Sequence, residues 1–381
     1  MSELWALYDM LERLAQRQKY YVPLSLSDMS GEYRVVPTLS SSERGKLGVV
    51  SHDGYVYAIG GFESSTYTNS CKRFDVKGSS WATKASMPTA RIATATTLCD
   101  DKIYVIGGTK SGGVSKNVEI YDPALNKWTT GQSVPKSLSD ICAASHNSII
   151  YIPGGSIEYS GLSAECLAYN TITDTWSTKA NMPDVRRGQV AAQIDGVIYV
   201  IGGWTNDADS AVKTNWAYNT TTNTWSAKAD MPAARFGMGG AVHGSSVYVV
   251  GGRAGTTNYS TVYSYNSGSN YWSTRASMPT TQSSHGAAFV DDVLYVVGGE
   301  PQGQSFAYYQ LSNYWVGTCK VAGYVYRDDI IYLKTGGAVL CGFPFCSAQL
   351  IVGNGSEHIV ENAGKLYALK AIEGYIRGGT I

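Results

Sequence analysis

Short apolar runs that end in a pair of glycines recur along most of the chain. Each run begins with tyrosine, as in Tyr57-Ala-Ile-Gly60-Gly61 and Tyr104-Val-Ile-Gly107-Gly108. The first glycines of the six pairs are 47 to 49 residues apart and are Gly60, Gly107, Gly154, Gly202, Gly251 and Gly298. A short run without polar alternation predicts a strand that is buried on both faces. The glycine pair predicts that the backbone leaves this strand at φ values that other residues avoid, and that neighbouring sheets approach closely.

An aromatic residue followed seven positions later by tryptophan marks the second half of each unit. The pairs are Phe74/Trp81, Tyr121/Trp128, Tyr169/Trp176, Tyr218/Trp225, Tyr265/Trp272 and Tyr308/Trp315. A polar turn such as Asp122-Pro-Ala-Leu-Asn126 separates the two rings, which predicts a tight hairpin whose rings pack between consecutive sheets. Each unit therefore supplies about four antiparallel strands. Since one such sheet cannot bury both faces alone, we expect six of them to form a ring, the β-propeller arrangement, rather than an open solenoid.

This spacing of glycine pair, tyrosine and tryptophan resembles that of the kelch-repeat family, whose units are about 50 residues long. The resemblance covers residues 45–316 and implies an all-β fold, a six-bladed kelch β-propeller, which we place at residues 31–316. Two segments compete for the outermost strand of the sixth sheet. Tyr33-Arg-Val-Val-Pro37 looks like a copy of that strand at the start of the chain, whereas Trp315 supplies it from the other end.

The two flanks follow no repeat pattern. In residues 1–30, Leu4, Leu7, Leu11 and Leu14 form an apolar stripe that predicts an N-terminal amphipathic helix over residues 2–18. This stripe either packs onto the propeller or drives formation of a homo-oligomer. Residues 317–381 predict a small β-rich C-terminal region, with one hairpin turning at Asp328-Asp329 and another at Asn354-Gly355. The region is expected to dock on the propeller or on a partner chain.

Composition excludes several classes of partner and site. The 30 basic and 30 acidic side chains cancel, which argues against a nucleic-acid binder. No apolar window reaches 18 residues and the first twenty residues carry six charges, so we predict no membrane insertion, no signal peptide and cytoplasmic synthesis. The seven cysteines are scattered and the five histidines are spread through the units and the tail, so no metal site and no cofactor are predicted.

The lengths of the connections point to one working face. Connections after the first and third strands of each unit are tight, whereas those after the second and fourth strands are long and variable and lie together at the other end of the propeller. Variable loops of a repeat protein often carry its binding surface. Sixteen residues before each first glycine stand Arg44, Arg91, Leu138, Arg186, Arg235 and Gln282, with Arg187 beside Arg186. These arginines either bind an anion at the channel mouth or tie the loops to a neighbouring blade.

Further candidate ligand-binding residues lie in the same long loops. They include Trp204, Arg253, Tyr259 and Glu300, and also Phe62, Glu158 and Tyr159, because exposed aromatics among polar groups suit contact with a peptide or a sugar ring. His285 is the histidine expected nearest the mouth. Clustered copper ligands, as in the copper oxidases among kelch relatives, are missing from this sequence.

We therefore predict a non-enzymatic recognition protein that binds a protein or a glycan through its long-loop face. The order of helix, propeller and tail is similar to modular phage tail-fibre or other virion components, so a receptor-binding or structural role in a virion is one expectation. The alternative is a sugar-acting enzyme of the sialic-acid mutarotase type, which the chain resembles in blade number and size. That enzyme would need an acid/base pair at the mouth, for which His285 with Glu300 or Glu158 are the candidates.

Overall fold

The computed structural model describes residues 33–309, except 36, 38, 40–43, 64, 206–209 and 302–303, together with short strands between residues 330 and 368. The chain divides into two compact units, one of them Tyr33–Tyr308 and the other formed by the two flanks. The unit Tyr33–Tyr308 lies inside the predicted domain 31–316. The predicted N-terminal helix lies outside the described residues.

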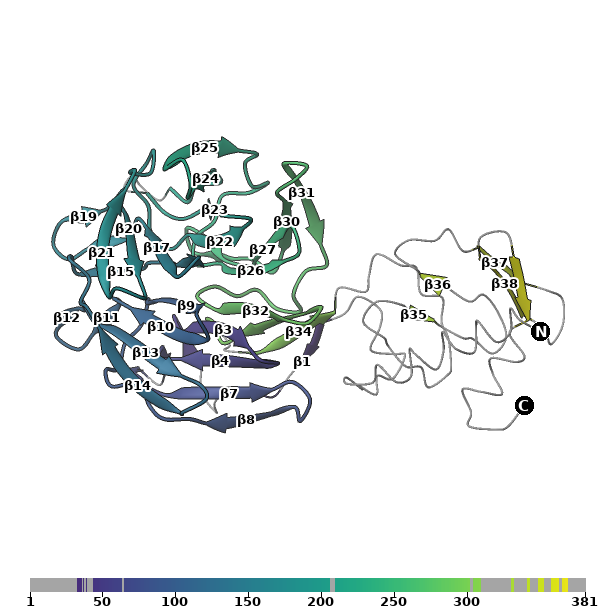
Figure 1. Ribbon diagram of the computed structural model, residues 1–381, viewed down its shortest axis with the longest axis horizontal. Helices are drawn as coiled ribbons and strands as arrows, with labels where there is room; N and C mark the ends of the chain where they lie inside the picture. Colours follow the sequence, from purple (N-terminus) through teal and green to yellow (C-terminus); the bar gives the residue numbers. More distant parts are fainter. Residues whose placement is uncertain are drawn as a thin grey trace. The chain divides into compact units, whose positions relative to one another are not determined.

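Six four-stranded antiparallel sheets make up the unit Tyr33–Tyr308 and surround a common centre (Figure 1). Written from the innermost to the outermost strand, blades one to three are β3 (Gly48–His52), β4 (Tyr55–Ile59), β7 (Cys71–Asp75), β8 (Ser80–Thr83); β9 (Ala95–Cys99), β10 (Lys102–Ile106), β13 (Val118–Asp122), β14 (Lys127–Gly131); β16 (Ala144–His146), β17 (Ile149–Pro153), β20 (Cys166–Asn170), β21 (Thr175–Lys179). Blades four to six are β22 (Val190–Ile194), β23 (Val197–Ile201), β24 (Asn215–Asn219), β25 (Thr224–Lys228); β26 (Gly239–His243), β27 (Ser246–Val250), β30 (Val262–Asn266), β31 (Tyr271–Arg275); β32 (Gly286–Val290), β33 (Val293–Val297), β34 (Phe306–Tyr309), β1 (Tyr33–Val35).

The innermost strands contact one another in a closed cycle, in the order β3, β9, β16, β22, β26, β32 and back to β3. The predicted six-bladed, all-β propeller is therefore confirmed. The start of the chain completes the last blade, because β1 pairs with β34 in the register Tyr33↔Tyr308 to Val35↔Phe306. Of the two segments that competed for this strand, the N-terminal one occupies it, and Trp315 lies outside the described residues.

Blades two to five are each joined to the preceding blade by a tryptophan and an asparagine or aspartate that bond to the same residue. In blade four, the indole Nε1 of Trp225 donates to the carbonyl oxygen of Ala180 (2.8 Å). Asn223 Oδ1 accepts the N–H of the same Ala180 (2.9 Å) and the hydroxyl of Tyr218 (2.7 Å). We call this arrangement the blade joint. It recurs with Asn126/Trp128 on Ala85, Asp174/Trp176 on Gln132 and Asn270/Trp272 on Ala229.

The joint between the last and first blades departs from this pattern in a consistent way. Trp81 Nε1 donates to the carbonyl oxygen of Pro37 (2.8 Å), and a proline has no N–H for an asparagine to accept. Blade one accordingly carries Phe74 where the others have tyrosine, and Ser79 where they have asparagine or aspartate. Pro37 follows β1 as Ala85 follows β8. β1 therefore resembles the outermost strand of the other blades both in its pairing with β34 and in the residue that it offers to the tryptophan of the next blade.

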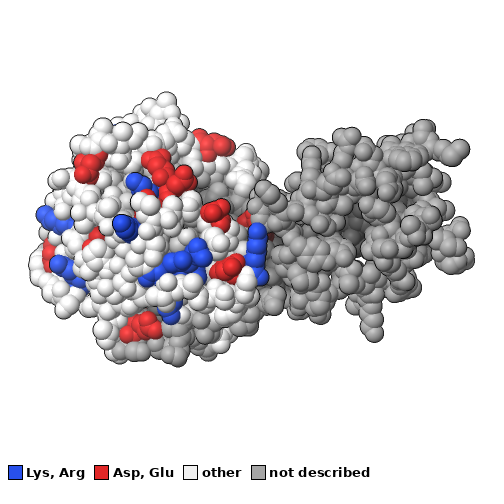
Figure 2. Space-filling view, turned by 60° about the horizontal axis from the view of Figure 1, so that its bottom comes forward, with Lys and Arg blue, Asp and Glu red and all other residues white. Residues whose placement is uncertain are grey.

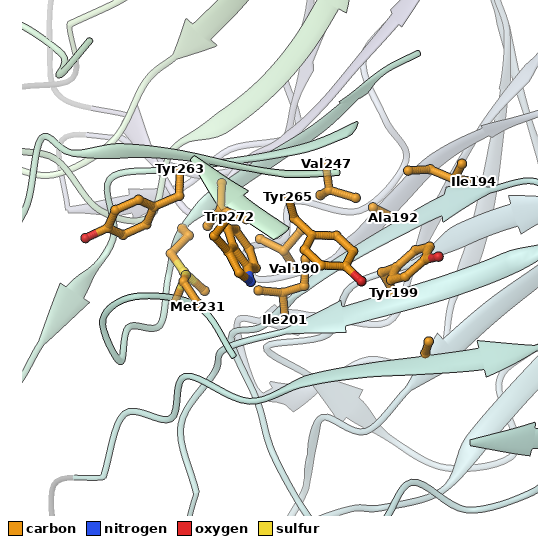
Figure 3. Packing of buried hydrophobic residues seen from close by; sticks show 13 residues of the cluster. Val190, Ala192, Ile194, Tyr199, Ile201, Met231, Val247, Tyr263, Tyr265 and Trp272 are labelled. Atoms are coloured by element: carbon orange, nitrogen blue, oxygen red, sulfur yellow. The ribbon is translucent and has the colours of Figure 1, made fainter. Parts of the chain in front are cut away.

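Buried rings and β-branched residues fill the space between neighbouring blades. Figure 3 shows this packing between blades four and five, where the rings of Tyr199 and Tyr265 lie 5.5 Å apart and Trp272 lies 5.2 Å from Tyr265. The glycine pairs permit close approach as predicted. Gly202 has φ 61°, and a Cβ atom there would lie 2.7 Å from the carbonyl oxygen of Arg235 in the next blade. Any other residue at this position would force the two blades apart.

Small hairpins follow the glycine pairs and lie at the long-loop end, which we call the loop face. They are β2 (Arg44–Gly45) with β5 (Phe62–Glu63) and β6 (Thr66–Tyr67); β11 (Thr109–Lys110) with β12 (Gly113–Val114); β15 (Leu138–Ser139) with β18 (Ser156–Ile157) and β19 (Gly161–Leu162); and β28 (Arg253–Ala254) with β29 (Thr257–Asn258). The opposite end carries the short turns.

The C-terminal region contains two small antiparallel sheets. β35 (Ile330–Ile331) pairs with β36 (Cys341–Gly342), and β37 (Gln349–Val352), β38 (His358–Asn362) and β39 (Lys365–Ala368) form a three-stranded sheet. The hairpin β37–β38 spans the predicted Asn354-Gly355 turn, whereas Asp328-Asp329 lies outside the described residues. Within the described part of the chain, we find no helix of the length and apolarity that crossing a membrane requires.

Replacing Asn223 by alanine should destabilise the propeller by about 2–3 kcal/mol, because two hydrogen bonds are lost and alanine must adopt φ 56°. Asn223→Asp should be tolerated, since Asp174 already fills the same place in blade three. Urea denaturation measures both changes, with the exposed Thr221→Ala as the control. Equal midpoints for Asn223→Ala and the control would contradict the role given to the blade joint.

Candidate functional site

A ring of backbone hydrogen bonds surrounds the channel mouth at the loop face. One residue from each blade takes part. In five blades it stands two residues before the innermost strand, and in blade three it stands four residues before it. The six residues are Lys46, Ala93, Asp140, Gly188, Gly237 and Ser284. All six have φ between 50° and 63°. Among these described residues, five of the six neighbouring pairs are joined by an N–H···O bond, for example from Ser284 to Gly237 (2.7 Å) and from Gly237 to Gly188 (2.8 Å). We call this ring the girdle.

Just outside the girdle, each blade presents one pair of facing residues in the same register. The pairs are Gly45/Phe62, Ile92/Thr109, Ser139/Ser156, Arg187/Trp204, Phe236/Arg253 and Ser283/Glu300. The backbone pairing repeats around the ring, whereas no two pairs have the same side chains at both positions. The girdle and these six pairs form the candidate binding surface.

Arg91 points into the protein and forms hydrogen bonds within its own blade. Its side chain is fully buried and donates to the carbonyl oxygens of Gly107 (2.6 Å) and Val105 (3.2 Å) and to the carboxylate of Glu119 (2.8 Å). Burial lowers the pKa of the Arg91 guanidinium, and the nearby Glu119 carboxylate opposes that change. Arg91 therefore ties its loop to the sheet of its own blade, which differs from the predicted tie to a neighbouring blade.

The equivalent arginines of blades four and five are arranged alike. Arg186 donates to the carbonyl oxygen of Gly202 (2.9 Å) and forms an ion pair with Asp184 (2.6 Å). Arg235 donates to the carbonyl oxygen of Gly251 (3.1 Å) and lies over the ring of Tyr259 (4.3 Å). Burial lowers the pKa of Arg235. Arg44 lies in β2, where its backbone pairs with Glu63.

The neighbouring Arg187 and the loop residue Arg253 lie at the surface instead. Arg187 is 38% exposed, pairs with Asp140 across the blade boundary (3.2 Å) and covers the ring of Trp204 (4.5 Å). Arg253 is half-buried and covers the ring of Phe236 (4.6 Å). The structure therefore brings Arg187, Trp204 and Arg253 of the predicted set together at the mouth.

His285 and Glu300 do not form the acid/base pair that a sugar-acting enzyme would need. The His285 side chain is buried, and its Nε2 donates to the carbonyl oxygen of Val250 (3.1 Å). Burial lowers its pKa to about 4. Glu300 is half-buried and pairs through its backbone with Ser283. Glu158 Oε1 accepts the N–H of Val114 in the neighbouring blade (3.0 Å).

A central cavity of about 350 Å³ lies along the propeller axis. All six innermost strands line it, mostly with small side chains such as Ala143, Ala191 and Ala287. In the part of the chain that is described, no three His, Cys, Asp or Glu side chains gather as metal ligands would. Figure 2 shows one face of the molecule, on which basic and acidic side chains lie in small mixed groups on an otherwise uncharged surface.

Two features of the site escaped the sequence analysis. The girdle depends on left-handed backbone at six equivalent positions, and glycine occupies two of them, Gly188 and Gly237. These two glycines stand fourteen residues before Gly202 and Gly251, a repeated offset that could have pointed to a special backbone position. The second feature is the asparagine or aspartate found two residues before five of the repeat tryptophans, which forms the blade joint at four of them.

Comparison with known proteins agrees with this architecture. The chain matches the family described as the KLHDC2/KLHL20/DRC7 Kelch-repeats domain over residues 31–181 and again over 129–299. The chain belongs to the kelch-repeat family. Among solved structures, "Structure of YjhT" has the same fold, with a TM-score of 0.61 and 16% sequence identity over 72% of this chain and 96% of that one. No curated protein matches the chain.

The kelch units themselves predict how the buried ion pair Arg91–Glu119 can be replaced. In blade three the same two positions hold Leu138 and Leu167. Arg91→Leu alone should cost about 3–5 kcal/mol, because it leaves the buried carboxylate of Glu119 without its partner. The double variant Arg91→Leu/Glu119→Leu should recover most of that loss. Urea denaturation of the two single variants and the double variant forms the cycle, and simple additivity would contradict the prediction.

The buried His285 should make the stability of the propeller depend on pH. Its pKa is lowered from 6.5 in the unfolded chain to about 4 in the folded one, so the unfolded chain binds the proton first as the pH falls. Stability should decrease by about 3 kcal/mol between pH 6.5 and pH 4. His285→Gln should weaken this dependence, since Gln189 in blade four already donates to Pro153 from the same position. Unfolding free energies with equal pH slopes would contradict this assignment.

Proposed function

We propose that this kelch propeller is a non-enzymatic recognition module whose loop face binds a protein or a glycan. The observation that supports the proposal most is that the residues holding the blades together repeat, whereas those exposed around the girdle vary. The blade joints and glycine pairs repeat from blade to blade, whereas the six facing pairs around the girdle share their backbone pairing and no two of them have the same side chains at both positions. Variation confined to one rim of a repeated frame is typical of a binding surface.

Tyr159 adds an aromatic contact residue to this rim. It stands at the tip of the hairpin β18–β19, is 98% exposed and has φ 60°. A bulky residue in left-handed backbone is strained, and the equivalent hairpin tips contain Gly112 and Gly255 at positive φ. The adjacent Glu158 fixes the hairpin to the neighbouring blade through Val114. An exposed aromatic ring on a hairpin that is fixed in this way suits contact with a partner.

The alternative of a sugar-acting enzyme of the sialic-acid mutarotase type has less support. Such an enzyme needs an accessible acid and base at the mouth. Among the described residues, His285 is buried against Val250 and has no hydrogen bond to Glu300 or Glu158. The virion setting and the homo-oligomer stay predictions from the sequence, and light scattering of the whole chain tests the second.

Substituting Tyr159 should separate binding from folding. Tyr159→Asn is expected to leave stability unchanged or slightly higher, because asparagine tolerates positive φ. It should weaken binding more than about fivefold if the ring is a contact residue. The full chain is first screened against a glycan array and a peptide display library to find its strongest ligand. Titration with that ligand then compares the affinities of the variants.

Ile172→Ser is the matched control, because Ile172 is 78% exposed but lies in a short turn at the opposite end. It should bind as the unchanged chain does. If binding is lost with Ile172→Ser and kept with Tyr159→Asn, recognition takes place at the end with the short turns rather than at the loop face. That result would refute the proposal.

A further inference from the structure

A tryptophan of blade four stands at a position that several other blades bury. Trp216 is the second residue of β24, and the second residue of the third strand in blades two, three and five is Glu119, Leu167 and Tyr263. Those three residues are at most 8% exposed, whereas Trp216 is only half-buried. The repeated frame therefore does not require an indole at this position, and part of Trp216 stays accessible to solvent.

A carboxylate lies at the edge of this indole. Asp184 Oδ2 accepts the Nε1–H of Trp216 (3.1 Å) and an Nη2–H of Arg186 (2.6 Å), and Asp184 Oδ1 accepts the Nε–H of Arg186 (2.7 Å). Arg186 is fully buried, so it holds the carboxylate from inside the protein with two parallel charge-assisted bonds. The Asp184 side chain itself is 34% exposed. We call Trp216 and Asp184 the Trp/Asp site.

The carboxylate of Asp184 can accept a further hydrogen bond. An ionised carboxylate offers about four lone-pair positions. The bonds from Arg186 and Trp216 occupy three of them, and Oδ1 receives only one bond from the residues that the structure describes. The exposed side of Asp184 is therefore free to accept from a hydroxyl group of a ligand that lies on the indole.

The charges around the Trp/Asp site are balanced. Arg186 neutralises Asp184, and Lys213, three residues before Trp216, pairs with Asp230 (3.5 Å). A cation would therefore gain little beyond its attraction to the ring. An anion would be repelled by the carboxylate that it has to approach. A neutral ligand that carries hydroxyl groups suits these surroundings better than either.

The Trp/Asp site lies outside the six facing pairs of the channel mouth. β24 is the third strand of blade four, and β23 separates it from the innermost strand β22. Trp216 and Tyr218 point to the same side of β24, and the ring of Tyr218 lies 5.7 Å from that of Tyr151 in blade three. Asp184 belongs to the segment that leads from blade three into blade four. The site is therefore at the boundary between these two blades.

We propose that the Trp/Asp site binds a neutral sugar ring of the β-linked glucose type. All ring substituents of β-glucose are equatorial, so each face of the ring is a flat apolar surface of C–H groups that can lie on an indole. A hydroxyl at the edge of the ring then donates to Asp184 Oδ1, which Arg186 already holds in place. This inference goes beyond the proposed function, because it assigns a separate site and a ligand class outside the girdle.

Cellobiose is the probe, titrated against the full chain by calorimetry and by ligand-observed NMR up to about 20 mM. It should bind with a Kd of about 1 mM. Glycerol, which has hydroxyl groups but no flat ring face, should not bind. Tetramethylammonium chloride, titrated in the same way, tests the alternative of a cation held over the indole.

Substitutions taken from other blades test the two members of the site. Trp216→Leu should weaken cellobiose binding more than tenfold, and Trp216→Tyr should restore part of the loss, since leucine and tyrosine occupy this position in blades three and five. Asp184→Ala should weaken binding about fivefold. It copies blade five, where Ala233 stands two residues before Arg235. Urea denaturation checks that each variant is folded.

Tyr271→Ser is the control for an exposed aromatic residue, because Tyr271 is 66% exposed and begins β31 in blade five. Its affinity for cellobiose should equal that of the unchanged chain. No binding of cellobiose, or equal affinity of Trp216→Leu and the unchanged chain, would overturn the inference. So would binding of tetramethylammonium without cellobiose. In all these cases a partner that is lost with Tyr159→Asn would leave the proposed function standing.

Discussion

Four of the six blade boundaries depend on one kind of contact, in which a tryptophan and an asparagine or aspartate of one blade bond to both backbone polar groups of a single residue in the blade before it. A radial sheet has two apolar faces, so its neighbours must stay at a fixed distance for both to remain buried. The pair Asn223 and Trp225 sets that distance through Ala180, and the buried rings fill the space it defines.

This frame decides which arginines are free to act on a partner. Arg186 and Arg187 are adjacent, yet successive residues of an extended segment point to opposite sides. Arg186 therefore turns inward and bonds to Gly202, while Arg187 turns outward and rests on Trp204. The loop face thus combines buried guanidiniums that stabilise the loops with exposed ones that are available for recognition.

Much of the fold follows from the sequence because the same marker residues recur in every unit. The glycine pairs and the aromatic–tryptophan spacing predict six blades and the position of the loop face. The sequence could also have shown which segment closes the ring. Pro37 lacks an N–H and Phe74 lacks a hydroxyl, and both departures fall at the same blade boundary, the one that β1 forms with blade one. In the girdle only Gly188 and Gly237 carry a sequence signal, because its left-handed backbone also includes Lys46 and Ala93, residue types that give none. The inward or outward direction of each arginine likewise depends on local backbone that spacing alone does not fix.

The girdle also has a consequence for access to the axis. Five of its six neighbouring pairs are joined by N–H···O bonds of 2.7 to 3.0 Å between residues of adjacent blades. The positions of the blades therefore fix the width of the mouth, and a partner seated on the rim meets a border of backbone rather than of side chains that can move.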